Sequence, residues 1–221
     1  MSVESKPSKF VFLCGSSCVG KTSIMKSFPI SIATTHTTYD VWKVEKIQMN
    51  VTDIRAQIGN PSWEDLMKDP KLAQWQQDHI LEVYRKRISD IVAKEENNKI
   101  YLFERCELDA NGYSSAFKVN KMPIQQMQFP YINYYIIHRP IDTTLVYNET
   151  ANRPPEIIRD DCATYISGIT HTYGARIPIW NNGNLKLDNN EPNTYAYNVY
   201  HSLNEGTTVE QLHKIIRFIL H

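Results

Sequence analysis

The amino-acid sequence predicts an α/β fold built on a parallel sheet of about five strands. Short apolar runs of strand length alternate along the chain with segments that have helical spacing of apolar residues, which is typical of βαβ units. A glycine-containing loop at residues 15–22 also lies between the first apolar run and the first helical segment. Together these observations predict a sheet whose strands are connected by helices.

The loop at residues 15–22 fills the pattern G-x-x-x-x-G-K-[ST] at every fixed position. The apolar run 10–14 before it predicts a buried strand, and residues 22–28 predict a helix that ends before Pro29. Glycines let successive N–H groups point inward, and the helix N-terminus adds partial positive charge. The sequence therefore predicts a nucleoside triphosphate site, in which Lys21 reaches the β- and γ-phosphates and the Thr22 hydroxyl binds Mg²⁺. Its residues are Gly15, Ser16, Ser17, Cys18, Val19, Gly20, Lys21, Thr22 and Ser23.

The other elements are predicted from apolar spacing and turn residues. Further strands are expected at 29–35, 99–103, 131–137 and 175–180. Helices are expected at 71–96, from Asp109 as N-cap, from Asp142, at 156–173, and at the C-terminus after a capping box at 207–210. The spacing predicts a helix or small hairpin within 41–61, and a loop or hairpin at 181–193.

Composition limits the classes of function. The chain has 221 residues and a formal net charge of zero, which gives no electrostatic reason to expect nucleic-acid binding. No apolar run is long enough to span a bilayer, and no secretory signal is visible. Four cysteines without a Cys-x-x-Cys pair predict free thiols in a reducing, cytoplasmic compartment. We expect a disordered leader at 1–8 and a single domain at 9–221.

Glu104 and Arg105 follow the predicted strand 99–103, at the end where open α/β sheets place their sites. A carboxylate there can accept a proton from an attacking hydroxyl or hold Mg²⁺, and an arginine can bind phosphate bidentately. A surface Glu–Arg pair is the alternative interpretation.

Arg153 and Arg159 lie six residues apart near the start of a predicted helix. On a lid around 150–162 they could neutralise charge on a transferring phosphoryl group and exclude water. The alternative is a solvated helix start, with Asp160 and Asp161 paired to the arginines.

Asp40, beside Tyr39 and Trp42, is expected beyond the second strand and facing the phosphate loop. It could hydrogen-bond a ribose-like hydroxyl, or act as the base in place of Glu104, while an adjacent aromatic ring stacks on a planar base. A loop carboxylate beside core aromatics is the alternative.

The phosphate loop, the step Glu104-Arg105-Cys106 and the basic stretch 153–159 resemble those of the P-loop nucleoside and nucleotide kinases. The Glu104 step is similar to that of deoxyribonucleoside kinases. With Leu108-Asp109 and Tyr113 it is also similar to the nicotinamide-riboside-kinase-like branch. The resemblance implies a three-layer, doubly wound sheet with helices on both faces, ATP and Mg²⁺ as co-substrates, and a small nucleoside-like acceptor. It implies that Lys21 and Thr22 act on the triphosphate, Glu104 acts as base or metal ligand, and Arg153 and Arg159 belong to the lid.

The leading hypothesis is a kinase that transfers the γ-phosphoryl group to a small nucleoside or nucleotide. A kinase acting on a polynucleotide or on a base in DNA would need a basic groove, for which Lys43, Lys46, Arg85, Lys86 and Arg87 are the candidates. A nucleotide-binding NTPase switch ranks third, because the third strand lacks a following Asp-x-x-Gly and no Asn-Lys-x-Asp occurs. The sequence leaves a homodimer open.

Overall fold

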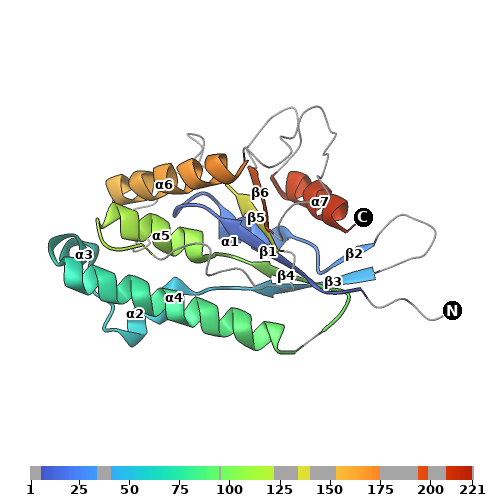
Figure 1. The fold of residues 1–221 in the computed structure, drawn as a ribbon, viewed down its shortest axis with the longest axis horizontal. Helices are drawn as coiled ribbons and strands as arrows, with labels where there is room; N and C mark the ends of the chain where they lie inside the picture. Colours follow the sequence, from blue (N-terminus) through green and yellow to red (C-terminus); the bar gives the residue numbers. More distant parts are fainter. Residues whose placement is uncertain are drawn as a thin grey trace.

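Six strands in the described part of the chain form one sheet, in the order β2-β3-β4-β1-β5-β6 (Figure 1). The computed structural model describes residues 6–33, 41–94, 96–121, 134–139, 153–174, 194–198 and 208–220. The strands are β1 (Lys9–Cys14), β2 (Ser31–Ala33), β3 (Val41–Ile47), β4 (Lys99–Phe103), β5 (Tyr134–His138) and β6 (Thr194–Asn198). The helices are α1 (Lys21–Ser27), α2 (Val51–Gln57), α3 (Trp63–Lys68), α4 (Pro70–Val92), α5 (Glu107–Ala116), α6 (Glu156–Gly174) and α7 (Thr208–Ile219).

The five strands from β3 to β6 in this order are mutually parallel, whereas β2 pairs antiparallel with β3 at the edge. In the register of the central strand, Phe12 lies opposite Phe103 on β4 and Ile136 on β5. The predicted parallel sheet of about five strands is therefore confirmed, with one antiparallel strand added. Because β1 is central, the loop that follows it lies in the middle of the carboxyl edge of the sheet.

Both faces of the sheet are covered by helices. Phe10 and Phe12 pack with side chains of α4, α5 and α6, whereas Val11 and Leu13 pack with side chains of α1 and α7. Successive strand residues point to opposite faces, so a central strand with two covered faces must be apolar at nearly every position. Burial on both faces therefore explains the continuous apolar run from which β1 was predicted. The expected three-layer, doubly wound arrangement is confirmed.

The strands away from the centre differ from the expectations. The second predicted strand is only the short antiparallel β2, and the segment 41–61 contains the parallel strand β3 followed by α2. Polar residues interrupt β3 because only one of its faces is well buried, so a continuous-run criterion misses it. The predicted strand 175–180 lies outside the described residues. The sixth strand, β6, was not predicted from the sequence, and its edge position does not demand an apolar run.

Helix α4 confirms the prediction at 71–96, although it ends at Val92. It begins after Asp69, whose carboxylate accepts hydrogen bonds from the N–H groups of Lys71 and Leu72. Its inward face differs from the predicted apolar stripe, because Trp75 is 51% exposed whereas Gln76 and Gln77 are buried. Two amides thus replace hydrophobic contacts where α4 passes the carboxyl edge of the sheet.

Helix α5 has its N-cap three residues earlier than predicted. Cys106 is the N-cap, so the expected N-cap position of Asp109 is wrong. Asp109 is instead the third residue of the helix in a capping box, where its Oδ2 accepts a hydrogen bond from the Cys106 N–H at 2.9 Å. Its carboxylate is buried, with the residue 1% exposed.

Residues 6–8, the described part of the expected leader, are bonded to the segment before β4. The Lys6 N–H donates to Asn98 Oδ1 at 2.9 Å, and the Ser8 hydroxyl donates to the Glu96 carbonyl at 2.6 Å. All four cysteines carry free thiols, as predicted. Among the described residues, no helix combines the length and apolar character needed to cross a membrane.

The contact between α5 and α6 yields a prediction for Gly112. A Cβ atom at this position would lie 2.6 Å from Cys162 Sγ. We expect Gly112→Ala to lower the free energy of unfolding by about 1–3 kcal/mol through overpacking, although alanine favours helix over glycine by about 1 kcal/mol. Gly168→Ala on α6, where a Cβ meets nothing within 4 Å, is the control and should be neutral or stabilising. Denaturant unfolding of both variants checks this, and equal effects would contradict the packing argument.

Candidate active site

The loop after β1 has the backbone of a phosphate cradle. Gly15 has φ +143°, and a Cβ there would lie 2.4 Å from the Arg139 carbonyl oxygen, so only glycine fits. Gly20 has φ +84° and directly precedes α1. Cys18 also adopts a positive φ of 67°, which the sequence pattern does not demand. The two glycines of the motif are thus required by the shape of the loop.

Lys21 is buried inside this loop. Its ammonium donates hydrogen bonds to the carbonyl oxygens of Gly15 and Ser16, the latter at 2.6 Å, and lies 3.7 Å from Asp109 Oδ1. Burial, reinforced by repulsion from Arg105 and opposed by Asp109, lowers the pKa of Lys21 to about 8. The lysine is therefore held at the loop with its ammonium protonated near neutral pH.

Asp109 connects α5 to the phosphate loop. Its Oδ1 accepts a hydrogen bond from the Gly15 N–H at 3.2 Å, while Oδ2 is bonded to the Cys106 N–H. Arg105 Nη1 lies 3.7 Å from the same Oδ1 atom. Burial raises the pKa of Asp109, against the opposing effect of Lys21 and Arg105. Sequence reasoning treated Asp109 only as a cap and as part of the family resemblance, and did not place it in the site.

Glu104 and Thr22 lie together at the carboxyl ends of β4 and β1. The Thr22 hydroxyl donates a hydrogen bond to Glu104 Oε1, so a hydroxyl and a carboxylate oxygen share one position beside Lys21. Mg²⁺ at phosphate sites is commonly held by one or two such protein oxygens together with substrate phosphates. This pair fits that donor set, and no cluster of three His, Cys, Asp or Glu residues occurs among the described residues.

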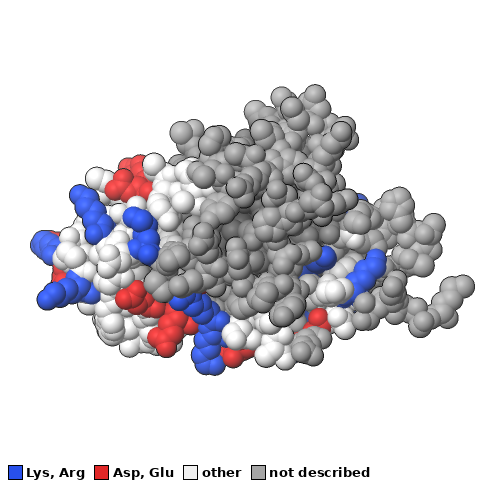
Figure 2. Space-filling model, viewed as in Figure 1, with Lys and Arg blue, Asp and Glu red and all other residues white. Residues whose placement is uncertain are grey.

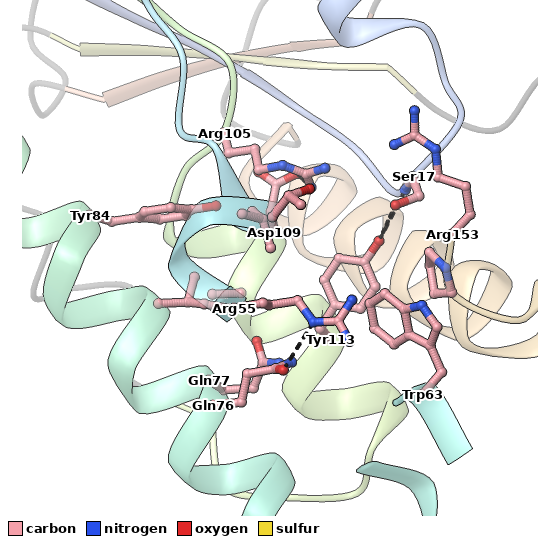
Figure 3. A pocket seen from close by; sticks show the side chains of 15 residues that line it. Ser17, Arg55, Trp63, Gln76, Gln77, Tyr84, Arg105, Asp109, Tyr113 and Arg153 are labelled. Carbon is pink, nitrogen blue, oxygen red and sulfur yellow. Dashed lines mark hydrogen bonds and ion pairs between the residues drawn. The ribbon is translucent and has the colours of Figure 1, made fainter. Parts of the chain in front are cut away.

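A pocket opens beside the loop, between α2, α4 and α5 (Figure 3). It contains about 570 Å³ of empty space, including its mouth to solvent. The phosphate loop forms part of its wall through Ser17, whose hydroxyl lies 2.7 Å from the Tyr113 hydroxyl. The lining residues are Ser17, Val51, Thr52, Arg55, Trp63, Gln76, Gln77, Ile80, Tyr84, Arg105, Asp109, Ala110, Tyr113, Arg153 and Pro154.

Most of these lining residues were missed by sequence reasoning. Arg55 lies in a segment predicted as helix or hairpin, and its guanidinium sits 4.1 Å from the centroid of the Trp63 ring. Gln76 accepts a hydrogen bond from Arg55 Nε at 3.2 Å. Gln77 is 2% exposed, and its Oε1 atom has no hydrogen-bond partner among the described residues. The one feature of the sequence that could have indicated this pocket is the pair of amides, Gln76 and Gln77, on the otherwise apolar side of a long helix.

The structure separates the two predicted lid arginines. Arg153 is exposed and lines the pocket, on the same side as Ser17 in Figure 3. Arg159 is buried, and it forms ion pairs with Glu156 at 2.8 Å and with Asp160 at 3.1 Å. It is not among the residues that line the pocket. For Arg159 the alternative interpretation, pairing with local carboxylates, describes the structure.

The remaining predicted site residues are placed as follows. Asp40 lies outside the described residues, and the next residue, Val41, begins β3 at the edge of the sheet opposite to the phosphate loop. Ser16 and Val19 are buried within the loop, whereas Ser23 is exposed on α1. Glu104 contacts Thr22, and Arg105 lies 3.7 Å from Asp109, which is bonded to Gly15 of the loop.

The comparisons with known proteins bear on the fold. No family model matches the chain, and no curated protein matches it. The chain is similar to a solved structure of EHV4 thymidine kinase (EHV4-TK complexed with TP5A), at 10% sequence identity and a TM-score of 0.45, over 96% of this chain and 92% of that chain. The strand order and the loop after the central strand define the fold. The chain has the α/β architecture that its sequence predicts.

Proposed function

We propose that the protein is an ATP- and Mg²⁺-dependent kinase that transfers the γ-phosphoryl group to a small nucleoside or nucleotide. One observation carries the proposal: the phosphate loop and a pocket with aromatic and amide side chains share a wall. Ser17 belongs to the loop and lines the pocket, and Asp109 contacts Gly15 and lines it too. A donor and an acceptor bound at these two places would be neighbours, which phosphoryl transfer requires.

The donor half of the site supports the proposal through its charge. The backbone N–H groups of the loop, the start of α1 and the Lys21 ammonium all offer positive charge to phosphate oxygens. Thr22 and Glu104 would hold Mg²⁺, which would neutralise charge that develops on the triphosphate. Glu104 contacts Thr22 and is not among the pocket-lining residues, which favours the metal role over the base role.

The pocket supports a planar, nucleoside-like acceptor. Trp63, Tyr84 and Tyr113 supply aromatic surface, and base rings stack favourably on such side chains. The Gln77 Oε1 atom can accept a hydrogen bond from a ring N–H or amino group, which would satisfy a buried acceptor. Aromatic groups combined with polar side chains that fix the orientation of a ligand are typical of small-molecule sites.

The polynucleotide alternative receives less support. Of its candidate cations, Arg85 pairs with Glu107 at 2.7 Å and Lys86 with Asp90 at 2.9 Å. Over the described part of the face in Figure 2, basic and acidic side chains lie next to one another without a continuous basic band. An extended basic groove is what binding to the nucleic-acid backbone would need.

A phosphoryl-transfer screen tests the proposal. Purified protein, Mg²⁺ and γ-labelled ATP are offered nucleosides, nucleoside monophosphates, nicotinamide riboside, and single-stranded or duplex DNA. Label on a small acceptor is the expected result. Label only on DNA would support the polynucleotide kinase, and release of free phosphate without any modified acceptor would support an NTPase switch.

Glu104→Gln should lower turnover by at least about a hundredfold, because a neutral amide binds Mg²⁺ more weakly than a carboxylate and cannot act as a base. The dependence of the rate on Mg²⁺ separates the two roles. If Glu104 binds the metal, the variant needs more Mg²⁺ for half-maximal rate. An unchanged Mg²⁺ requirement would instead assign it as the base, and a loss of only a few-fold would exclude Glu104 from both roles.

The lowered pKa of Lys21 predicts a pH dependence of ATP binding. The ammonium is protonated below its pKa of about 8 in the free protein, and a bound triphosphate raises that pKa again. Above this pH, binding must take up a proton, so the Kd for Mg·ATP should rise by up to about tenfold per pH unit. Isothermal titration between pH 7.5 and 9.5 measures it. Lys21→Met should bind more weakly and without this slope; the same slope in the variant would contradict the assignment.

A further inference from the structure

Arg55 on α2 is a buried cation whose contacts, within the described part of the chain, are with neutral groups. It is 4% exposed, its Nε donates to Gln76 Oε1 at 3.2 Å, and its Nη2 donates to the Pro61 carbonyl oxygen. The ring of Trp63 lies under the guanidinium at 4.1 Å. These contacts orient the side chain without neutralising its charge.

No carboxylate among the described residues forms an ion pair with Arg55. Buried charges in proteins are normally paired, because an unpaired one loses its hydration and gains no ion pair that offsets the loss. Two other buried arginines follow the rule: Arg159 is paired with Glu156 and Asp160, and Arg105 lies 3.7 Å from Asp109. Burial lowers the pKa of Arg55, and only Tyr113 opposes this effect. Arg55 is therefore a buried cation for which the described residues supply no anionic partner.

The pocket beside Arg55 is itself cationic. Its lining contains three arginines, Arg55, Arg105 and Arg153, and one carboxylate, Asp109. Asp109 does not serve Arg55, because it lies 3.7 Å from both Lys21 and Arg105. An electrically neutral nucleoside would leave this excess of positive charge in place.

Asp109 is also poorly suited to act as a general base. Both of its oxygens accept backbone hydrogen bonds, from the N–H groups of Gly15 and Cys106. A hydroxyl acceptor needs a base to remove its proton during transfer. A phosphate monoester does not, because its second pKa is near 6 and its oxygens are already ionised at neutral pH.

We propose, on the basis of the kinase function above, that the acceptor is a nucleoside monophosphate whose phosphate group binds Arg55. In the reaction, an ionised oxygen of that phosphate attacks the γ-phosphorus of ATP. The bond between the γ-phosphorus and the β–γ bridging oxygen breaks, and its electron pair leaves with ADP. The products are ADP and a nucleoside diphosphate, and no proton is transferred. Gln77 and the aromatic side chains contact the base.

Binding without turnover tests the proposal on the native protein. Nucleosides and their 5′-monophosphates, matched base by base, are titrated into protein saturated with Mg·ADP, with inorganic phosphate as a further arm. For at least one base, the monophosphate should bind at least about thirtyfold more tightly than the nucleoside. Nucleosides that bind as tightly as their monophosphates would overturn the proposal. Inorganic phosphate that binds as tightly as every monophosphate would do the same.

Three variants locate the effect. Arg55→Gln should remove the advantage of the monophosphate, while its Kd for the nucleoside stays within about twofold of the native value. Arg217→Gln, an exposed position on α7 across the sheet, makes the same change of charge and should keep the advantage. Arg55→Lys preserves the charge and should retain part of it, which gives a second measurement if the glutamine variant does not fold. Monophosphate binding that is unchanged in Arg55→Gln would refute the assignment.

The outcome is separable from that of the kinase proposal. If nucleosides are phosphorylated and monophosphates bind no better, the kinase function stands and the role of Arg55 fails. If monophosphates bind in an Arg55-dependent manner but no label is transferred, the recognition stands and the kinase function fails.

Discussion

The buried carboxylate of Asp109 is the contact on which the rest of the site depends. It lies between two cations, Lys21 and Arg105, at 3.7 Å from each, and it holds the Gly15 N–H at the start of the loop. Removal of one member of such a buried cluster leaves an uncompensated charge, which typically costs about 3–5 kcal/mol. The junction fixes α5 against the loop after β1. It thereby sets the position of one wall of the pocket relative to the phosphate cradle.

The central sheet supplies the rigidity that this junction needs. Phe12 and Phe103, opposite one another on β1 and β4, have ring centroids 4.6 Å apart and are almost fully buried. Such packing on both sides of the sheet leaves little freedom to the strand ends. The groups that follow β1 and β4, Lys21 and Glu104 among them, therefore start from fixed positions. The like charges of Lys21 and Arg105 would move apart in a flexible loop. Here the rigid scaffold keeps them close to one another.

The sequence predicted the central part of this structure better than its periphery. The loop from Gly15 to Thr22 and the strand before Glu104 are specified locally, by glycine geometry and by strands buried on both faces. The pocket is not: Arg55 and Gln77 come from different helices, and their meeting depends on how α2 packs on α4. Asp109 was misjudged because an acidic residue near a helix start has the same local pattern whether its carboxylate caps the helix or points into a site. Tertiary packing alone distinguishes these cases.

The hydrogen bond between Ser17 and Tyr113 has a consequence for how two ligands would sense one another. Ser17 donates its backbone N–H to the Tyr113 hydroxyl at 3.2 Å, and the two hydroxyls lie 2.7 Å apart. One residue belongs to the loop and the other to α5. A ligand that draws the loop inward must strain or break these bonds, and a ligand that presses on the tyrosine ring must do the same. A ligand bound at one place would thus change the binding free energy of the ligand at the other, and the effect would be equal in both directions. The Ser17–Tyr113 pair thereby couples the two halves of the site.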